Sequence, residues 1–390
     1  MSDAALVLIT TSFPIAGDGS EAAGSFVSDL AEELAHHMPV RVVAPGSLSA
    51  REQWAPNVEV FRYAAPAKPL STLKPWRPME LMNIVSVLRA GARATHDAVH
   101  AGSTAHMLAL WALPSGEWAR RVSRATGVPY SVWTLGSDIW VLGRIPLVRS
   151  LLRHVLYNAH TCYSDGLQLA DDTRRIAGRG VDFLPSTRRI ESRGEPPLAD
   201  SPPYRMLFLG RWHCNKGVDL LLDALDMLDD IDWSRIASVE IQGGGPLEGI
   251  VRERVGRLCA QGRPVEAGRF LVKAEAEAAI VRADWVLIPS RIESIPVVFS
   301  DAMKLGRPVI STPVGDLPRL LAEYSVGVCS HDVTGAAFAA AIREGLSLPP
   351  TTRADAIGAV VALFSMSGAI VPKILGMLGN ANGHAGKMHE

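Results

Sequence analysis

The chain has 390 residues, of which 48% are hydrophobic and 20% charged, so it is long enough for two globular domains and too apolar for a disordered protein. Its formal net charge of −1 argues against a nucleic-acid-binding protein, which is usually distinctly basic. The cysteines are scattered without metal-ligand spacing, which is typical of reduced residues in a cytosolic protein; they are Cys162, Cys214, Cys259 and Cys329.

The first part of the chain alternates strand and helix signals, and its N-terminus lacks the basic segment of a signal peptide. The expected elements are strands at 5–10, 40–44 and 130–134, a strand end at 97–100, and a helix at 25–36. Between the first strand and helix lie Gly17, Gly19 and Gly24. The gap after Gly19 is too long for the dinucleotide motif G-x-G-x-x-G, which argues against an oxidoreductase.

Residues 143–159 combine apolar residues at helical spacing with several bases, and residues 68–77 add lysines, an arginine and Trp76. One interpretation is an ordinary amphipathic helix whose charges face water. The other is a surface that docks on an anionic membrane and reaches a lipid-linked acceptor. The sequence leaves both interpretations open.

The polar, proline-rich residues 191–203 predict a linker between domain 1–190 and domain 204–365. From 205 to about 345, strand and helix signals alternate, which favours a second parallel sheet. The uncharged run 356–372 is short for a membrane span of about 20 residues, so buried helices are expected there. A further helix is expected at 366–379 and a disordered tail at 380–390.

Basic residues flank the turn after the first strand of the second domain. The strand ends at Gly210, Arg211 follows, and Lys216 comes directly before a helix that runs from about 218 to 228. A glycine run that includes Gly243 and Gly244 follows a later strand, and taken alone it indicates no more than a tight strand-to-helix connection.

Asp230-Ile231-Asp232 has the letters of the metal-binding Asp-x-Asp motif. It follows the helix 218–228, however, and is interpreted as the charged, solvated end of that helix, with no neighbours to complete an oxygen site. No metal site is expected.

Two carboxylates follow the strongest strand signal, residues 285–288. Glu293 lies in the loop after this strand, and Asp301 lies in the helix expected at 297–305. Ligands bind at the carboxyl edge of open α/β sheets, where backbone N–H groups suit phosphate and carboxylates suit sugar hydroxyls. The pattern therefore favours a site for a phosphorylated sugar compound, although acids that complement a helix dipole would give the same pattern.

This region resembles the E-x7-E region of the retaining, GT-B-fold glycosyltransferases of family 4. The resemblance rests on Pro289-Ser290-x-x-Glu293, Asp301-Ala302-Met303, Gly306-x-Pro308-Val309 and Val314-Gly315. It covers 205–321 closely and 5–164 loosely. It implies an α/β protein with two Rossmann-like parallel-sheet domains that face each other across a cleft. It also implies that the helix at 366–379 crosses back to the first domain.

The resemblance implies roles for individual residues of the second domain. Glu293 would face the donor sugar, and Asp301, where the family usually has Glu, would face the ribose. Arg211 and Lys216 would neutralise the donor diphosphate, and with Glu293 they form the expected catalytic set. The remaining donor-binding residues would be Gly210, Gly243, Gly244, Ser294, Ile295 and Pro296.

In the first domain, the resemblance places Gly24 near the donor phosphate and the acceptor. Residues 134–138 resemble the family's His-Gly-x-Asp loop, with Leu135 where the family often has His. Asp138 is then an acceptor-side residue, and a helix N-cap is its alternative role.

The expected function is transfer of a hexose from a nucleotide-diphosphate sugar to a hydroxyl of a saccharide or lipid-linked acceptor, with retention and without a metal or cofactor. Polysaccharide biosynthesis in the cytoplasm, or at the inner face of the membrane, is the corresponding context. A GT-B-fold epimerase or phosphorylase is one alternative. Because Asp301 and Leu135 depart from the family pattern, a sugar-nucleotide-binding protein with an inactive site is another.

Overall fold

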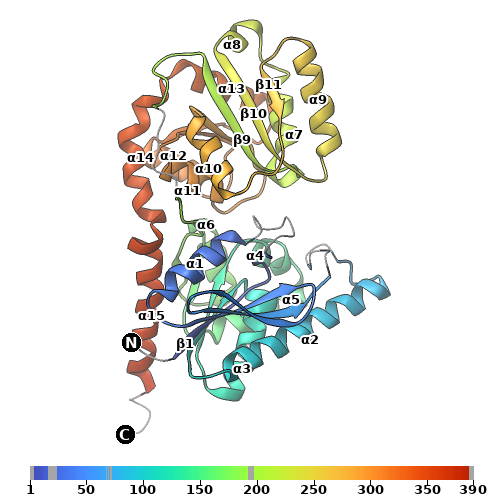
Figure 1. The fold of residues 1–390 in the computed structure, drawn as a ribbon, viewed down its shortest axis with the longest axis vertical. Coiled ribbons are helices and arrows are strands. Elements are labelled where there is room, and N and C mark those ends of the chain that lie inside the picture. Colours follow the sequence, from blue (N-terminus) through green and yellow to red (C-terminus); the bar gives the residue numbers. More distant parts are fainter. Residues whose placement is uncertain are drawn as a thin grey trace. The chain divides into compact units, whose positions relative to one another are not determined.

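The computed structural model describes residues 4–15, 24–66, 68, 70, 73–191 and 197–385, and its internal contacts divide the chain into two compact units (Figure 1). Unit 1 comprises Met1–Pro185 and Met366–Glu390, and unit 2 comprises Ser186–Ser365. The predicted linker 191–203 falls within unit 2 by this division. Gly17 and Gly19 lie outside the described residues.

Unit 1 is built on an 8-stranded sheet with the order β3-β4-β2-β1-β5-β6-β7-β8. Its strands are β1 (Ala5–Ile9), β2 (Val40–Gly46), β3 (Ala50–Ala55), β4 (Val58–Ala64), β5 (Thr104–Leu110), β6 (Tyr130–Thr134), β7 (Cys162–Ser164) and β8 (Asp182–Phe183). The edge strand β3 pairs antiparallel with β4, and the other pairs are parallel. The strand order reverses between β1 and β5, which is the switch point of a doubly wound sheet.

Helices cover both faces of this sheet. They are α1 (Ser25–Ala35), α2 (Pro78–His100), α3 (Glu117–Thr126), α4 (Ser137–Trp140), α5 (Pro146–Tyr157), α6 (Leu167–Ala177) and α15 (Val371–Ala385). Alternate residues of β1 enter different cores: Val7 and Ile9 pack with α2, α3, α5 and α6, whereas Leu6 and Leu8 pack with α1 and α15. A strand buried on both faces is expected to be a continuous apolar run, as β1 is.

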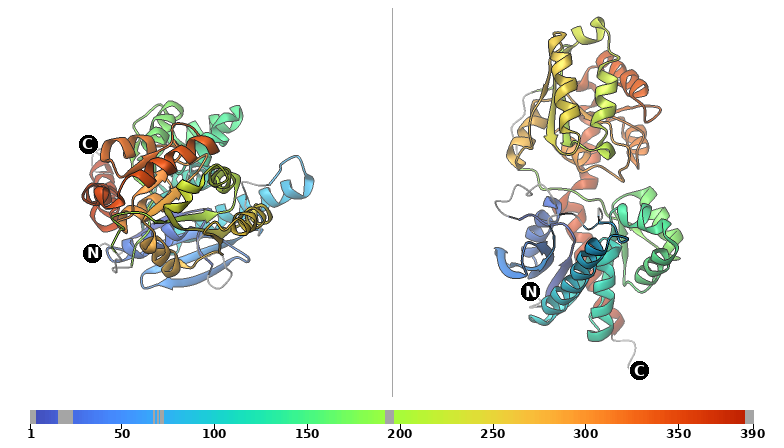
Figure 2. Two further views of the ribbon diagram at one scale, coloured as in Figure 1. Left: turned by 90° about the horizontal axis from the view of Figure 1, so that it is seen from above. Right: turned by 90° about the vertical axis from the view of Figure 1, so that its right-hand side faces the viewer.

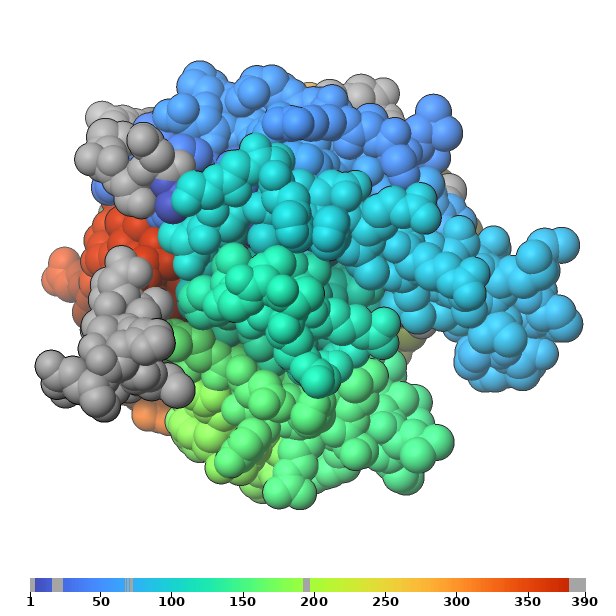
Figure 3. Space-filling model, turned by 90° about the horizontal axis from the view of Figure 1, so that it is seen from below, coloured from blue at the N-terminus to red at the C-terminus, as the bar shows by residue number. Residues whose placement is uncertain are grey.

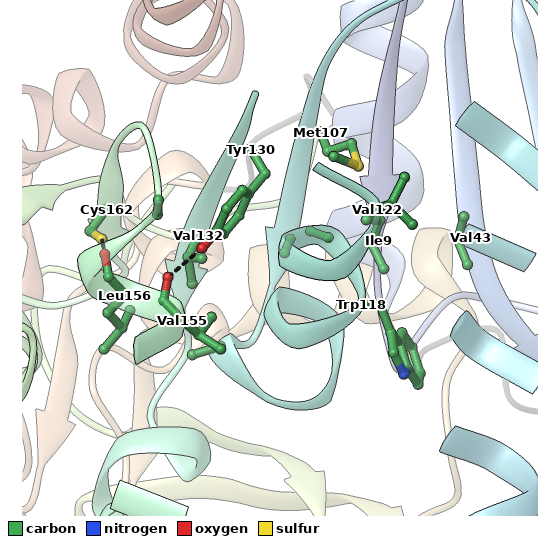
Figure 4. Packing of buried hydrophobic residues seen from close by; sticks show 14 of the residues in the cluster. Ile9, Val43, Met107, Trp118, Val122, Tyr130, Val132, Val155, Leu156 and Cys162 are labelled. Carbon is green, nitrogen blue, oxygen red and sulfur yellow. Dashed lines mark hydrogen bonds between the residues drawn. The ribbon is translucent and has the colours of Figure 1, made fainter. Parts of the chain in front are cut away.

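The first of these cores is closed by tight packing and by buried hydrogen bonds, two of which Figure 4 shows. The hydroxyl of Tyr130 donates to the carbonyl oxygen of Val155 on α5 at 2.7 Å. A Cβ on Gly91 of α2 would overlap the ring of Trp118, so this glycine lets α2 and α3 approach closely.

The prediction of a strand end at 97–100 is wrong, because these residues form the last turn of α2. The buried residues of that helix, Val87, Gly91, Ala94 and Ala98, recur at helical spacing. They are mostly small, which weakens the apolar signal. The strand expected in this region is β5, which begins at Thr104.

Unit 2 is built on a 6-stranded, fully parallel sheet with the order β11-β10-β9-β12-β13-β14. Figure 2 shows the helices of unit 2 around this sheet. Its strands are β9 (Tyr204–Arg211), β10 (Ile236–Gly244), β11 (Val265–Ala267), β12 (Trp285–Ile288), β13 (Val309–Ser311) and β14 (Gly327–Cys329). The order reverses between β9 and β12, so these two neighbours form its switch point.

The helices of unit 2 are α7 (Val218–Leu225), α8 (Asp230–Ser234), α9 (Glu248–Ala260), α10 (Lys273–Arg282), α11 (Val297–Lys304), α12 (Leu317–Tyr324), α13 (Gly335–Ser347) and α14 (Ala354–Val361). Residues of α7, α9 and α13 share one core with β9 and β10. Helix α7 begins after Gly217, and Val218, Leu221 and Leu225 recur at helical spacing on its buried face.

The C-terminal helix α15 packs on unit 1, where Ile370, Val371 and Ile374 join the core that also holds α1. It continues to Ala385, through residues 380–385 where a disordered tail was expected; each added helical residue gains one backbone hydrogen bond. Within the described residues, no single helix is long and apolar enough to span a membrane. The bent pair Pro350–Phe364 and Met366–Leu378 meets the criteria of length and composition together.

Candidate active site

The switch point of unit 2 brings two polar loops together. Strands β9 and β12 are parallel neighbours, with Leu207 opposite Val286, so their carboxyl ends lie at the same edge of the sheet. Gly210 and Arg211 end β9, and the loop after β12 carries Glu293. This edge is where open α/β sheets bind ligands.

Lys216 and Glu293 form an ion pair between these loops, through Nζ and Oε1. The lysine side chain is 30% exposed and the glutamate side chain 18%. Both charges therefore remain partly accessible to solvent. A positive and a negative group side by side at the carboxyl edge can bind a ligand that has both anionic groups and hydroxyls.

The close approach of the two loops depends on Gly217, which has φ +69° at the start of α7. A Cβ at this position would overlap the carbonyl oxygen of Pro289, the residue after β12. The loop after β9 is also fixed internally, because the backbone N–H of Asn215 donates to Nδ1 of His213 at 3.1 Å. Only glycine at position 217 allows both the left-handed conformation and the close approach to the carbonyl oxygen of Pro289.

Arg291 joins the same two loops by hydrogen bonds, a role that was not predicted from the sequence. Its Nη1 donates to the carbonyl oxygen of Cys214 and to Oδ1 of Asp219, each at 2.7 Å, and its backbone N–H donates to the carbonyl oxygen of Asn215 at 2.8 Å. Arg291 lies two residues before Glu293, so these bonds hold Glu293 opposite Lys216. Nothing in the local sequence distinguishes Arg291 from a solvated surface arginine.

Ser294, Ile295 and Pro296, predicted to bind the donor, are buried and lead into α11. The carbonyl oxygen of Ser294 accepts from the backbone N–H of Asp316 at 3.0 Å. A Cβ on Gly315 would overlap that same oxygen. The Val314-Gly315 pair noted in the sequence therefore packs the next loop, after β13, against the Glu293 loop.

The glycines that end β10 allow close packing beside β9. A Cβ on Gly243 would overlap the carbonyl oxygen of Gly210, and one on Gly244 would lie 2.9 Å from the ring of Phe270. The backbone N–H of Trp212 donates to the carbonyl oxygen of Gly244 at 2.8 Å. These contacts account for the run as a tight connection at the same edge. Arg211 is exposed there and forms no ion pair with any described residue.

Asp301 lies inside the protein and does not face an open site. It is 1% exposed, and its Oδ2 accepts from Nε of Arg188 at 3.0 Å and from Nη2 of the same side chain. Burial raises the pKa of the Asp301 carboxyl, and Arg188 opposes that rise. The structure therefore shows this carboxylate paired with the partly buried guanidinium of Arg188, and a contact of Asp301 with the ribose stays a prediction.

The same carboxylate helps to anchor the segment where unit 2 begins. Nζ of Lys304, on α11, donates to Oγ1 of Thr187 at 2.5 Å and to the carbonyl oxygen of Arg188 at 2.6 Å. The backbone N–H of Glu191 donates to Oε2 of Glu277 at 3.1 Å. Asp301 thus belongs to a set of contacts that fix residues 187–191 on unit 2.

In unit 1, Asp138 is 1% exposed and joins two loops at the carboxyl edge of the sheet. Its Oδ2 accepts from the backbone N–H of Ala112 at 2.7 Å, and its Oδ1 accepts from that of Leu135 at 3.4 Å. Burial raises the pKa of Asp138 to about 6, although these N–H groups oppose the rise. The N-cap of α4 is Gly136, so Asp138 bonds the loop backbone without being the N-cap residue.

Gly24 is the N-cap of α1, with φ +76°. A Cβ there would lie 2.5 Å from the carbonyl oxygen of Ser12, so the loop after β1 passes directly over the start of this helix. A glycine is required at this position by conformation and by space. This geometry neither needs nor excludes a ligand.

The described residues contain no group of three or more His, Cys, Asp or Glu side chains that could hold a metal ion. Asp230 and Asp232 do not end a helix, as the sequence indicated, but begin α8. Asp229 is its N-cap and forms a capping box with Asp232, while Asp230 pairs with Arg263 at 2.6 Å. Their charges are used within unit 2.

Part of the second unit matches a known protein family. Residues 203–347 match the family model described as Glycosyl transferases group 1. Two relatives are named D-inositol 3-phosphate glycosyltransferase: one from Corynebacterium aurimucosum is 27% identical over 221 residues, and one from Jonesia denitrificans is 32% identical over 194 residues. These matches cover 55% and 45% of this chain, and 50% and 43% of the relatives, so the chain spans half or less of their length.

Solved structures match over nearly the whole chain. Sucrose-phosphate synthase from Thermosynechococcus elongatus is 19% identical with a TM-score of 0.75, and the match covers 98% of this chain and 100% of that one. The Anabaena protein HepE in complex with UDP is 14% identical with a TM-score of 0.66, covering 97% and 100%. The chain therefore has the GT-B fold of two Rossmann-like domains. The match to the glycosyl transferases group 1 model lies within the second unit.

Proposed function

We propose that this protein is a glycosyltransferase that moves a hexose from a nucleotide-diphosphate sugar to an acceptor hydroxyl, with retention and without a metal ion. The observation that carries the proposal is the Lys216–Glu293 pair at the switch point of unit 2. The group 1 domain match and the named glycosyltransferase relatives support the same activity. The acceptor is a saccharide or a glycolipid, met in the cytoplasm or at the inner face of the membrane.

In this mechanism Lys216 and Arg211 bind the diphosphate of the donor. Breaking the bond between the anomeric carbon and the phosphate oxygen leaves an additional negative charge on that diphosphate. Fixed cations at this place stabilise the transition state more than the ground state. The acceptor oxygen bonds to the anomeric carbon on the same face, and its proton passes to the departing phosphate oxygen.

Glu293 has the role of orienting the donor sugar through its hydroxyls. Its ion pair with Lys216 positions the carboxylate before the donor binds. When the diphosphate engages Lys216, Glu293 is released to accept hydrogen bonds from the sugar. This mechanism requires no ribose contact from Asp301, whose carboxylate is buried against Arg188.

The test is thermal stabilisation of the full chain by a panel of UDP-, GDP-, ADP- and TDP-sugars, with and without divalent metal. A ligand present at 100 times its Kd stabilises the native state by about 2.7 kcal/mol. One nucleotide class is expected to raise the melting temperature regardless of metal, and Lys216→Ala is expected to abolish the rise.

Lys273→Ala is the matched control, because Lys273 also pairs with a glutamate and is 29% exposed, yet lies on α10 outside the switch point. It is expected to retain the full rise. A panel without any shift, or a shift that survives in Lys216→Ala, would contradict the proposed donor site.

A further inference from the structure

The first turns of α2 form an apolar surface that no other described part of unit 1 covers. Residues 78–86 contain no buried residue, and the first buried residue of α2 is Val87. Figure 3 shows this segment, in light blue, projecting beyond the rest of unit 1. Trp76, Met79 and Met82 are 75%, 72% and 69% exposed.

This surface is too continuous to be ordinary surface scatter. Leu81 and Leu88 are also exposed, and Ile84 and Val85 are only partly covered. Single exposed apolar residues are common on soluble proteins, but a contiguous patch marks an interaction site. We refer to Trp76, Met79, Leu81 and Met82 as the α2 tip.

The charges around the α2 tip are almost all positive. Residues 68–93 contain five bases and one acid: Lys68, Lys74, Arg77, Arg89 and Arg93 against Glu80. This excess lies in a chain whose formal net charge is −1. A local basic excess beside apolar side chains complements an anionic surface.

The single acid is neutralised by its neighbours. Oε1 of Glu80 accepts from Nζ of Lys68 at 3.1 Å and from Nη1 of Arg77 at 3.4 Å, and Oε2 accepts from the backbone N–H of Lys74 at 2.5 Å. These contacts also lower the pKa of Glu80, the backbone bond from Lys74 most of all. The carboxylate therefore does not oppose the approach of an anionic surface.

Trp76 has the position of an interfacial anchor. The ammonium of Lys74 lies 5.9 Å from the centroid of its ring. Tryptophan rings are enriched at the headgroup level of bilayers, and lysines reach from there to the phosphates. Along the chain, Trp76 lies between the bases Lys74 and Arg77, and the apolar start of α2 follows. This order suits a segment whose bases lie at the headgroups and whose helix enters the acyl chains.

We infer that the α2 tip inserts into an anionic lipid bilayer, with Lys68, Lys74 and Arg77 against the phosphates and Met79, Leu81 and Met82 among the upper acyl chains. The bilayer is favoured over a second protein because bases surround the apolar residues on the described part of this segment. This surface differs from α5, where Leu147 is exposed and which lies in the region 143–159 that the sequence indicated. The basic residues 68–77 come directly before α2 in the chain.

The inference is tested by flotation of the full-length protein with two kinds of vesicle, one of equal phosphatidylglycerol and phosphatidylcholine and one of phosphatidylcholine alone. Wild type is expected to float with the anionic vesicles. Met79→Ser with Met82→Ser is expected to weaken that binding by about tenfold or more, since each substitution removes apolar area from the inserted surface. Lys74→Glu with Arg77→Glu is expected to weaken it similarly, as is high salt.

The matched control is Met227→Ser with Ile231→Ser, a change of similar chemistry at exposed apolar residues of unit 2, where Ile231 is 74% exposed. It is expected to bind like wild type. Because all these side chains are exposed, the melting temperatures are expected to stay unchanged. Measuring them checks that the variants fold.

Three results would overturn the inference. The first is that wild type binds neither vesicle. The second is that Met79→Ser with Met82→Ser binds as well as wild type, whereas Leu147→Ser on α5 binds less. The third is that light scattering shows a dimer of wild type that Met79→Ser with Met82→Ser dissociates. The last result would make a second copy the occupant. The assay contains neither donor nor acceptor, so its outcome is independent of the proposed activity.

Discussion

The two sheets share one strand order around their switch points, but the charged residues at the two edges are used differently. In unit 2, Lys216 and Glu293 pair across neighbouring loops and remain partly exposed. In unit 1, the acid at the corresponding edge, Asp138, is sealed and accepts only from backbone N–H groups. Both edges offer a place for a ligand, and we expect the chemistry at the edge whose charges are accessible.

The largest expected effect comes from removing the accessible charge. Glu293→Gln is expected to lower kcat/KM for transfer by about 100- to 1,000-fold, the usual cost of losing one preorganised polar group at a reacting centre. The rate is measured with the donor that the thermal panel identifies. Glu323→Gln, at another glutamate in an ion pair, is the control and should stay near wild type. Near-normal transfer by Glu293→Gln would contradict the proposed role of Glu293 in the reaction.

The next effect separates the conformation of a glycine from its contact. Gly217 and Gly178 have nearly equal angles, φ +69° and +67°, but a Cβ added to Gly178 in unit 1 would have no neighbour within 4 Å. Gly178→Ala is expected to cost about 1 kcal/mol of unfolding free energy from conformation alone. Gly217→Ala should cost about 3 kcal/mol, because it also displaces Pro289. Urea unfolding measures both.

A matching loss of donor binding in Gly217→Ala would link the contact with Pro289 to the site. Equal destabilisation by the two substitutions would instead show that the approach of the β9 and β12 loops is not tight enough to matter.

The smallest effect is a pH dependence at the sealed acid of unit 1. Burial raises the pKa of Asp138 to about 6 from an ordinary value of 3.8, so the folded state binds more protons than the unfolded state between these values. Its stability contribution is therefore full below about pH 4 and declines as pH rises through about 6, by at most about 3 kcal/mol. Asp138→Asn is expected to lack this decline.

The measurement is the difference in unfolding free energy between wild type and Asp138→Asn at pH 4.5 and pH 7, in which other titrating groups largely cancel. Wild type should lose stability relative to the variant at the higher pH. A difference that does not change with pH would mean that Asp138 is better solvated than its burial indicates.

Much of the fold could be predicted because strong local patterns coincide with the elements. The strands at 130–134 and 285–288 are found at those residues, and the helix expected at 297–305 is α11. Each is bounded by Gly or Pro at one end or at both. The prediction around α2 was wrong because the buried residues of this helix are small and its first turns contain no buried residue, so the helical pattern is weak.

The candidate site was predictable residue by residue but not as an arrangement. Lys216 and Glu293 each follow a strand, so their positions at the edge follow from the pattern. Their pairing depends on Arg291 and Gly217, whose partners are distant in sequence. The orientation of Asp301 depends on Arg188, 113 residues earlier, and no local pattern encodes such a contact.

The position of α15 has a consequence for the order in which this protein is made. The core between α1 and the sheet of unit 1 includes Ile370, Val371 and Ile374, which come after all of unit 2 in the chain. During synthesis, this core therefore lacks these three residues while about half of the chain is still to be translated. Unit 2 has its own complete core and can fold during that interval, whereas unit 1 acquires its last core helix only when residues 366–378 leave the ribosome.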